Sequence, residues 1–573
     1  MNKIKLKHII KLVFPIKLRK ILRRVQTRIY IKCIKIRTLS LIPTLKSLES
    51  TKKTPQFVVS LTSYGKRLKK SAPFAIITLL DQSIKPDKII LWVAKEDKKN
   101  VPKIMDKLTK KGLEIRFCED IKLYNKLIPS IEAFPDSYIV TADDNIYYPQ
   151  NWFEQLIIEH QKNPNKIICH KAKRINVDEN HNLTPYSQWA SFVQPISYFA
   201  HLFVSHEKNA PNHQLESIFP LSKSGIMYPP KSLYYDVTKK NLFMKLAADA
   251  NDFWFWAMAV INREYNCDES PFIVIENNSS KDLQTVNIVR KNDALNCNLD
   301  SQINCVLGQY PVLRDVIKKI DRFCYGLLAP CEYKMKLDTT DWIQKQIYEN
   351  GCYEKPHVLA LLSLISEDGI FFDIGTNIGV YSLNFSKKAK VVYAFEATKK
   401  TYDHLVETIS ANKVKNIYSN FNAVHCESGV DIEIRQGNEA QGIINIGNNG
   451  MFNEEGIVVN IVKSITIDDF VNSNNIQRID IIKMDIEGNE LNALKGAKKS
   501  ILRFRPIILC EINPEMNVKA GYTAEELFDF IKYTLNYVPM LFEDKIFLHV
   551  NKKYVVKSQN NVFFFPKEKG IIK

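Results

Sequence analysis

Short apolar runs alternate with longer amphipathic segments from residue 56 onwards. The runs have the length of buried strands, and the segments between them place apolar residues at helical spacing. In the first half of the chain this pattern predicts helices at 71–82 and 102–111 and strands at 57–61, 88–94, 113–118 and 137–140. Strands that alternate with helices form a parallel sheet covered by helices.

The same alternation returns after residue 369. It predicts a helix at 491–499 and strands at 370–372, 391–395, 478–485 and 506–511. A chain of 573 residues is long enough for more than one domain. We therefore predict an α/β protein with two domains, and we place its parts at 1–54 (head), 55–311 (first domain), 312–324 (helical connector) and 325–573 (second domain).

Positive charge is concentrated in the head. Residues 1–50 hold fourteen Lys or Arg and one acid, Glu49, which gives +13 of the chain's net +18. The cations alternate with apolar residues, and no uncharged run approaches the 18 residues of a membrane-spanning helix. Such a segment suits the cytoplasmic face of an anionic membrane. Two alternatives are a helix docked on the first domain and a nucleic-acid-binding arm, which nothing later in the chain supports.

The eleven cysteines form no Cys-x-x-Cys pair and have no histidine partners at zinc spacing. An odd number of cysteines without a secretion signal indicates free thiols in a reducing compartment. We therefore expect a cytoplasmic protein with no nucleic-acid partner. Its head would make peripheral contact with the inner face of the membrane.

A glycine turn follows the first strand of the second domain. Residues 373–379 have the pattern Asp-x-Gly-x-x-x-Gly, which brings backbone N–H groups close to a polar ligand. Glu396 ends the next strand, where a Rossmann-type unit holds a ribose diol. The pattern is not Gly-x-Gly-x-x-Gly and therefore favours a methyl donor over a dinucleotide. The expected cofactor-binding residues are Asp373, Gly375, Asn377, Gly379 and Glu396.

A second group of polar residues follows the strand at 478–485. It reads Lys483-x-Asp485-x-Glu487-Gly488-x-Glu490, and Gly496-Ala497 and Glu511 come later. Together with the glycine turn, these residues resemble the FkbM family of S-adenosylmethionine-dependent O-methyltransferases over residues 323–566. One departure is Ala397, where the family usually has proline after the acid.

This resemblance implies a Rossmann-like class I methyltransferase domain with S-adenosylmethionine as cofactor. Asp373, Gly375, Asn377 and Gly379 would hold the methionine end of the cofactor. Asp485 and Glu487 are candidates for catalytic base or metal ligand, and Lys483 would neutralise the pair. Alternation along an extended chain puts Lys483, Asp485 and Glu487 on one side. The alternative is a structural ion pair that caps the next helix.

In the first domain the strand at 137–140 runs into Asp143, Asp144 and Asn145, and the first strand runs into residues 62–67. Carboxylates at a strand end that cannot pair locally suit a divalent cation bound to a diphosphate. With the segments 124–129 and 225–230, this stretch resembles the Asp-x-Asp motif of GT-A-fold glycosyltransferases, over residues 55–311.

The resemblance implies a metal site for Mn²⁺ or Mg²⁺ at Asp143, Asp144 and Asn145, and the alternative for the carboxylates is a solvated turn. Asn145 departs from the expected aspartate. Asp252 would be the general base of an inverting transferase or, alternatively, a helix N-cap. The expected donor-binding residues are Thr62, Tyr64, Lys66, Arg67, Lys126 and Asp143.

Two nucleotide-binding domains of these kinds would make a bifunctional enzyme of capsule- or lipopolysaccharide-type surface-polysaccharide assembly. The first domain would transfer a sugar from a nucleotide-sugar donor to a glycan or lipid-linked glycan acceptor, and the second would methylate a sugar hydroxyl. The alternative keeps the methyltransferase and makes the first domain a non-catalytic glycan-binding or membrane-docking module. A nucleic-acid methyltransferase with a basic arm lacks any base-stacking signature.

Overall fold

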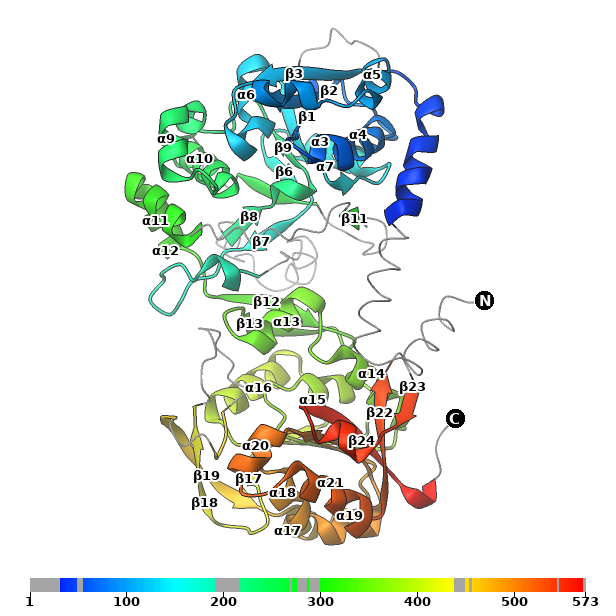
Figure 1. Cartoon of the computed structure of the whole chain (residues 1–573). Helices are drawn as coiled ribbons and strands as arrows, with labels where there is room; N and C mark the ends of the chain where they lie inside the picture. Colours follow the sequence, from blue (N-terminus) through cyan, green and yellow to red (C-terminus); the bar gives the residue numbers. More distant parts are fainter. Residues whose placement is uncertain are drawn as a thin grey trace. The chain divides into compact units, whose positions relative to one another are not determined.

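The structure is a computed structural model, and it describes residues 31–48, 55–190, 217–266, 271–275, 286–287, 299–436, 449–452, 456–543 and 546–569. The chain divides into two compact units, Met1–Arg322 and Phe323–Lys573 (Figure 1). Each unit is mixed α/β and is built around a largely parallel sheet, which confirms the predicted fold class at this level.

The first unit has a seven-stranded sheet in the order β10-β6-β9-β4-β1-β2-β3. Strands β3, β2, β1 and β4 are parallel, and β9 is antiparallel to β4 and β6. The sheet strands are β1 (Phe57–Thr62), β2 (Lys88–Ala94), β3 (Leu113–Cys118), β4 (Tyr138–Asp143), β6 (Ile167–Cys169), β9 (Ile226–Tyr228) and β10 (Phe272–Val274). Two small ribbons pair β5 (Ile146–Tyr147) with β11 (Val286–Asn287) and β7 (Ala172–Arg174) with β8 (Ile218–Pro220).

Helices cover both faces of this sheet because side chains alternate along its strands. Val59 and Leu61 of β1 belong to a buried cluster with α4 and α7, whereas Val58 belongs to the cluster of α10 and α12. The helices of this unit are α3 (Arg67–Lys70), α4 (Ala72–Leu80), α5 (Ile104–Thr109), α6 (Ile128–Ala133), α7 (Trp152–Lys162), α9 (Lys240–Leu246), α10 (Asn251–Asn266), α11 (Leu299–Gln309) and α12 (Val312–Lys318).

Two segments at the ends of this unit pack onto it. In the described part of the head, Leu45 is buried in the cluster of α4 and α5, and the Lys35 ammonium donates to the Lys70 carbonyl at 2.6 Å. The basic residues 1–30 lie outside the described residues. Leu313 and Val316 of α12, in the segment expected as a connector, are buried in the core of the first unit.

The second unit has an eight-stranded sheet in the order β16-β15-β14-β20-β21-β24-β22-β23. The first five strands are parallel, and the last three pair antiparallel. They are β14 (Ile370–Ile374), β15 (Val391–Glu396), β16 (Ile417–Phe421), β20 (Ile481–Met484), β21 (Ile507–Ile512), β22 (Tyr537–Glu543), β23 (Ile546–His549) and β24 (Asn560–Pro566). Because β14 has β15 on one side and β20 on the other, the strand order reverses there, as in Rossmann-type sheets.

Apolar side chains pack on both faces of this second sheet. Phe372 of β14 lies in the cluster of α17–α19 and α21, whereas Phe371 stacks on Phe385 of α15. The helices are α13 (Trp342–Asn350), α14 (Lys355–Leu364), α15 (Val380–Phe385), α16 (Lys399–Ala411), α17 (Ile467–Ser473), α18 (Glu490–Gly496), α19 (Lys498–Phe504), α20 (Pro514–Lys519), α21 (Ala524–Asp529) and α22 (Lys552–Val555). The small ribbons are β12 (Phe323–Leu328) with β13 (Tyr333–Asp338), and β17 (Ala423–Val424), β19 (Val458–Ile465) and β18 (Asp431–Arg435). No helix in the described part of the chain is long and apolar enough to cross a membrane.

Candidate functional site

A pocket of about 350 Å³ lies at the carboxyl ends of β14, β15 and β20 in the second unit. This is the reversal point of the sheet, where open α/β sheets bind their ligands. Its volume falls in the range of small-molecule sites. The sequence-predicted residues that line it are Gly375, Asn377, Glu396, Lys483, Asp485 and Glu487.

Gly375 brings the two strand-end loops of the pocket into contact. Its φ is +76°, and a Cβ added there would lie 1.8 Å from the Asp485 carbonyl oxygen. The Lys483 ammonium donates to the Gly375 carbonyl at 2.9 Å. Only glycine fits this position, because any side chain would push the loop after β14 away from the loop after β20.

Two of the predicted cofactor residues do not line the pocket. Asp373 is fully buried, and its Oδ2 accepts from the Thr376 hydroxyl at 2.8 Å and from the Ser382 N–H at 2.9 Å. Gly379 precedes α15 with a φ of +92°, and a Cβ there would lie 2.4 Å from Leu405 Cδ1. Both residues therefore shape the glycine turn from behind.

Glu396 places a buried carboxylate on the pocket wall. Its Oε2 accepts from the Asn377 N–H and its Oε1 from the Thr398 N–H, each at 2.8 Å. Burial raises the pKa of this carboxyl, and these backbone hydrogen bonds oppose the rise. Hydrogen bonds from the side chains of Thr401 and Thr398 also oppose it. These contacts fix the carboxylate on the pocket wall, at the position expected for a ribose contact.

The pocket brings together Lys483, Asp485 and Glu487, but not by alternation along an extended strand. Strand β20 ends at Met484, and Glu487 has a φ of +52°, so the chain turns before Glu487. The expectation of one extended chain through all three residues is wrong. The Lys483 ammonium lies 3.5 Å from Asp485 Oδ2.

Burial and the charges of this group shift its pKa values. Burial raises the pKa of Asp485, although Lys483 opposes the rise. Burial and then the Asp485 charge raise the pKa of Glu487 well above its ordinary value. A buried carboxylate with a raised pKa is a stronger base, and this is the property that proton abstraction from a hydroxyl needs.

Sequence reasoning assigned no role to three further acids at this site. Glu354 lines the pocket, has a φ of +49° and accepts from the Tyr381 hydroxyl at 2.8 Å. Glu511 also lines it, and Glu490 lies behind the loop after β20. The position of Glu511 at the end of a strand was a usable signal, whereas Glu354 comes from a segment that shows no strand-end pattern.

The first unit brings most of its predicted residues together at the carboxyl ends of β1 and β4. The Arg67 guanidinium lies 2.7 Å from Asp144 Oδ1, and the Ser63 hydroxyl donates to Asp144 Oδ2 at 2.6 Å. Burial raises the pKa of Asp144 to about 6, against the opposing effects of Arg67 and Ser63. Asn145 is buried beside it in the chain.

Lys126 interacts electrostatically with the two remaining predicted acids, Asp143 and Asp252. Its buried ammonium lies 3.2 Å from Asp143 Oδ1 and donates to the Ser222 hydroxyl at 2.7 Å. Burial lowers the pKa of Lys126, but the charges of Asp143 and then Asp252 raise it overall. Helix α10 already begins at Asn251, whose amide donates to Asp252 at 2.7 Å. Asp252 therefore lies in the first turn of α10 and acts electrostatically on Lys126.

The remaining residues predicted to bind the nucleotide-sugar donor make fewer contacts with the cluster. The Thr62 hydroxyl donates to the Trp92 carbonyl at 3.0 Å, and Tyr64 is half exposed and accepts from Arg67 at 3.3 Å. Lys66 is exposed. These side chains border the cluster and remain candidates for donor contacts.

The carboxylates after β4 have local partners, contrary to expectation. Both oxygens of Asp144 are occupied by Arg67 and Ser63, and Asp143 pairs with Lys126. The premise that they cannot pair locally is therefore wrong. As arranged, Asp144 offers a divalent cation no oxygen without a partner. The metal site at Asp143, Asp144 and Asn145 stays a prediction.

The family match to known proteins falls within the second unit. The family model of the methyltransferase FkbM domain matches residues 373–538, which include the glycine turn, Glu396 and the loop after β20. The predicted FkbM methyltransferase domain is confirmed for this part of the chain.

Two curated proteins are similar to parts of the chain. Hexuronic acid methyltransferase AglP of Haloferax volcanii is 28% identical over 148 residues, which are 26% of this chain and 58% of AglP. Uncharacterized protein MJ1452 of Methanocaldococcus jannaschii is 34% identical over 86 residues, which are 15% of this chain and 32% of that protein. The chain therefore covers less than two thirds of the length of either relative.

Solved structures give weak likenesses. An rRNA methylase from Streptococcus thermophilus has a TM-score of 0.22 and 12% identity, covering 37% of this chain and 93% of its own. TrmK of M. capricolum, in complex with S-adenosyl-homocysteine, has a TM-score of 0.22 and 11% identity, covering 37% of this chain and 68% of its own. Neither score supports an inference about function.

Proposed function

We propose that the second unit is an S-adenosylmethionine-dependent O-methyltransferase that acts on a sugar hydroxyl. The observation that carries this proposal is the pocket at the reversal point of the sheet, which is lined mostly by residues of the region matched by the FkbM domain. Its wall offers the Gly375 turn to the methionine end of the cofactor and the Glu396 carboxylate to its ribose. The similarity to a hexuronic acid methyltransferase supports a sugar as the acceptor.

The bound cofactor supplies a methyl group on a sulfonium sulfur; the acceptor oxygen forms the new O–CH₃ bond as the S–CH₃ bond breaks. The protein must hold the hydroxyl in line and take its proton. Glu487 is the base, because its carboxylate lines the pocket and burial raises its pKa, and Asp485 lines the pocket beside it. Lys483 fixes Asp485 and the Gly375 loop through its contacts at 3.5 and 2.9 Å.

A binding experiment tests the cofactor site. Glu396→Gln should bind S-adenosylhomocysteine about tenfold more weakly than the wild type, because charge-assisted hydrogen bonds to the ribose contribute about 1.5 kcal/mol or more. Isothermal titration measures the dissociation constants. Glu407→Gln, an exposed change on α16, is the matched control and should bind as the wild type does.

Methyl transfer itself is measured with radiolabelled S-adenosylmethionine and oligosaccharides that contain hexuronic acids or neutral sugars. Label in the glycan that survives mild base treatment, as an ether does and an ester does not, would support O-methylation of a hydroxyl. Tight cofactor binding with label transferred only to tRNA or protein would contradict the sugar acceptor.

For the first unit we propose transfer of a sugar from a nucleotide-sugar donor, for surface-polysaccharide assembly on the cytoplasmic side of a membrane. The observation that favours this is the cluster of Arg67, Lys126 and Asp252 at the reversal point between β1 and β4. The two cations suit a diphosphate, and Asp252 suits a general base. A non-catalytic docking module is the alternative.

A thermal-shift screen against UDP, GDP, CMP and their sugars, with and without Mn²⁺, tests the first unit. One nucleoside diphosphate should raise the melting temperature, and Lys126→Met should remove that shift because it deletes the buried cation. Lys122→Met, a change at an exposed lysine of the same segment, should keep it. If no nucleotide shifts the wild type while S-adenosylhomocysteine does, the docking module replaces the transferase.

A further inference from the structure

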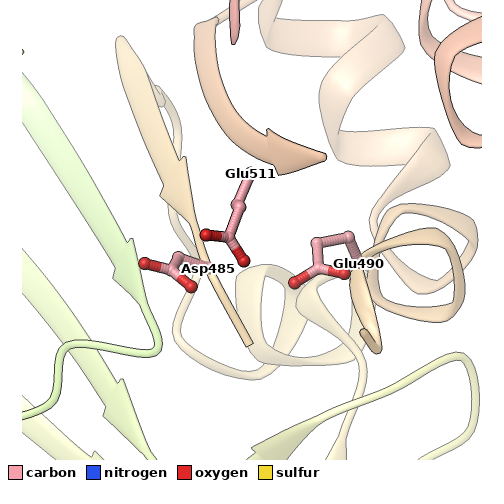
Figure 2. Close-up of side chains that lie close together, drawn as sticks. All are labelled: Asp485, Glu490 and Glu511. Carbon is pink, nitrogen blue, oxygen red and sulfur yellow. The ribbon is translucent and has the colours of Figure 1, made fainter. Parts of the chain in front are cut away.

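Three carboxylates from separate elements converge beside the pocket of the second unit. Asp485 follows β20, Glu511 lies in β21 and Glu490 begins α18 (Figure 2). One oxygen of each lies within 4.8 Å of the others. Among the described residues, these are the acids whose geometry could hold one metal ion.

The hydrogen bonds of these side chains leave oxygens free for a ligand. Glu490 Oε1 accepts from the Ile486 N–H at 2.9 Å, so the loop fixes this side chain while Oε2 has only a long 3.3 Å contact with the Tyr522 hydroxyl. Glu511 is 5% exposed, and its Oε1 accepts from the Gln559 amide. Its Oε2 is buried and has no hydrogen-bond partner in the described structure.

Glu511 Oε2 is the informative atom. A buried carboxylate oxygen without a partner costs free energy unless a proton or a cation satisfies it. Figure 2 shows the Glu511 carboxylate directed toward Asp485. One oxygen of this carboxylate lies within 4.8 Å of an oxygen of Asp485 and of Glu490.

The local charge is also unbalanced. Three acids converge here, and Lys483, a cation beside them, already contacts Asp485 and the Gly375 carbonyl. A divalent ion would supply the missing positive charge.

We propose that Asp485, Glu490 and Glu511 bind a divalent cation of the Mg²⁺ or Mn²⁺ type at the edge of the methyl-transfer pocket. Such hard ions take oxygen ligands and retain several waters when a protein offers few carboxylates. Because Asp485 and Glu511 also line the pocket, those water positions face the acceptor. Two neighbouring sugar hydroxyls could replace them, which would orient the acceptor and make its hydroxyl more acidic. This role rests on the proposed sugar methyltransferase, whereas ion binding does not.

Manganese binding by the full-length, chelator-treated protein tests the site, with electron paramagnetic resonance to measure free Mn²⁺. The wild type should bind an ion that Glu511→Gln binds at least about tenfold more weakly. The matched control is Glu515→Gln, whose side chain is 81% exposed four residues further along the chain, and it should bind as the wild type does. Asp144→Asn identifies any ion held by the first unit, which Glu511→Gln would leave in place.

Circular dichroism and S-adenosylhomocysteine binding show whether each variant is folded. If Glu511→Gln fails to fold, Asp485→Asn replaces it with the same expected loss. No Mn²⁺ bound by the wild type, or equal affinity in the wild type and the folded variant, would overturn the proposal and show that the acids share protons. Loss of the ion with cofactor binding intact supports the metal site, even where the sugar substrate proves wrong.

Discussion

At the scale of single residues, Gly375 leaves the least room for a Cβ among the described glycines. Gly375→Ala would place a Cβ 1.8 Å from the Asp485 carbonyl oxygen, at a φ of +76°. Because both the clash and the backbone conformation are unfavourable, we expect a loss of about 3 kcal/mol in unfolding free energy and of cofactor binding. Urea unfolding and titration with S-adenosylhomocysteine measure the two effects.

Gly429→Ala is the matched control because it measures the cost of alanine at a positive φ without a steric clash. Gly429 has a φ of +85°, and a Cβ there would meet nothing within 4 Å. This variant should lose about 1 kcal/mol and keep its affinity for the cofactor product. Equal losses of stability and of cofactor affinity in the two variants would mean that the Gly375 loop moves to accommodate the added Cβ. The close contact between the two loops would then not be needed for cofactor binding.

Residue roles could be predicted where a local pattern fixes them. The glycine turn and Glu396 follow from the strand-turn-strand spacing, and Gly375 and Glu396 do line the pocket. The role of Asp373 behind the turn could not be predicted, because it depends on hydrogen bonds to Thr376 and Ser382 within a folded loop. The left-handed conformation of Glu487 is equally hidden, since a positive φ is uncommon for a residue other than glycine.

At the scale of elements, strands could be predicted more closely than helices. Strands β2 and β3 begin and end where the apolar runs do. The helix expected at 71–82 is α4, and the short helix α3 before it was not expected. The helix expected at 491–499 is divided at Ala497 into α18 and α19. Apolar spacing continues across this break, so periodicity alone cannot reveal it.

Contacts between elements explain why the partners of the acids could not be predicted. Asp144 follows β4, but its partner Arg67 begins α3, and only the parallel pairing of β1 with β4 brings them within 2.7 Å. The convergence of Asp485, Glu490 and Glu511 could not be predicted for the same reason. These acids meet only because two strands are adjacent in the sheet and a turn follows the first of them. Charge compensation depends on sheet order, which sequence spacing does not specify.

At the scale of the whole molecule, the chain joins two units that each have their own core. The described buried clusters of the first unit draw on residues between 34 and 320, and those of the second on residues between 370 and 564. If the first unit makes the glycan that the second methylates, the shared chain raises the effective concentration of that intermediate. The separate cores suggest that the two units also fold and bind independently.

Independent units should unfold in separate calorimetric transitions. The cofactor product should raise the midpoint temperature of only one of them. A ligand at one hundred times its dissociation constant stabilises its own unit by about 2.7 kcal/mol. For a unit of this size that corresponds to a shift of about 5–10 °C. Saturating S-adenosylhomocysteine should therefore raise one transition by this amount and leave the other unchanged, and Glu396→Gln should reduce the shift. If both transitions rise together, the units unfold as one cooperative body, and the tether does more than hold two enzymes close.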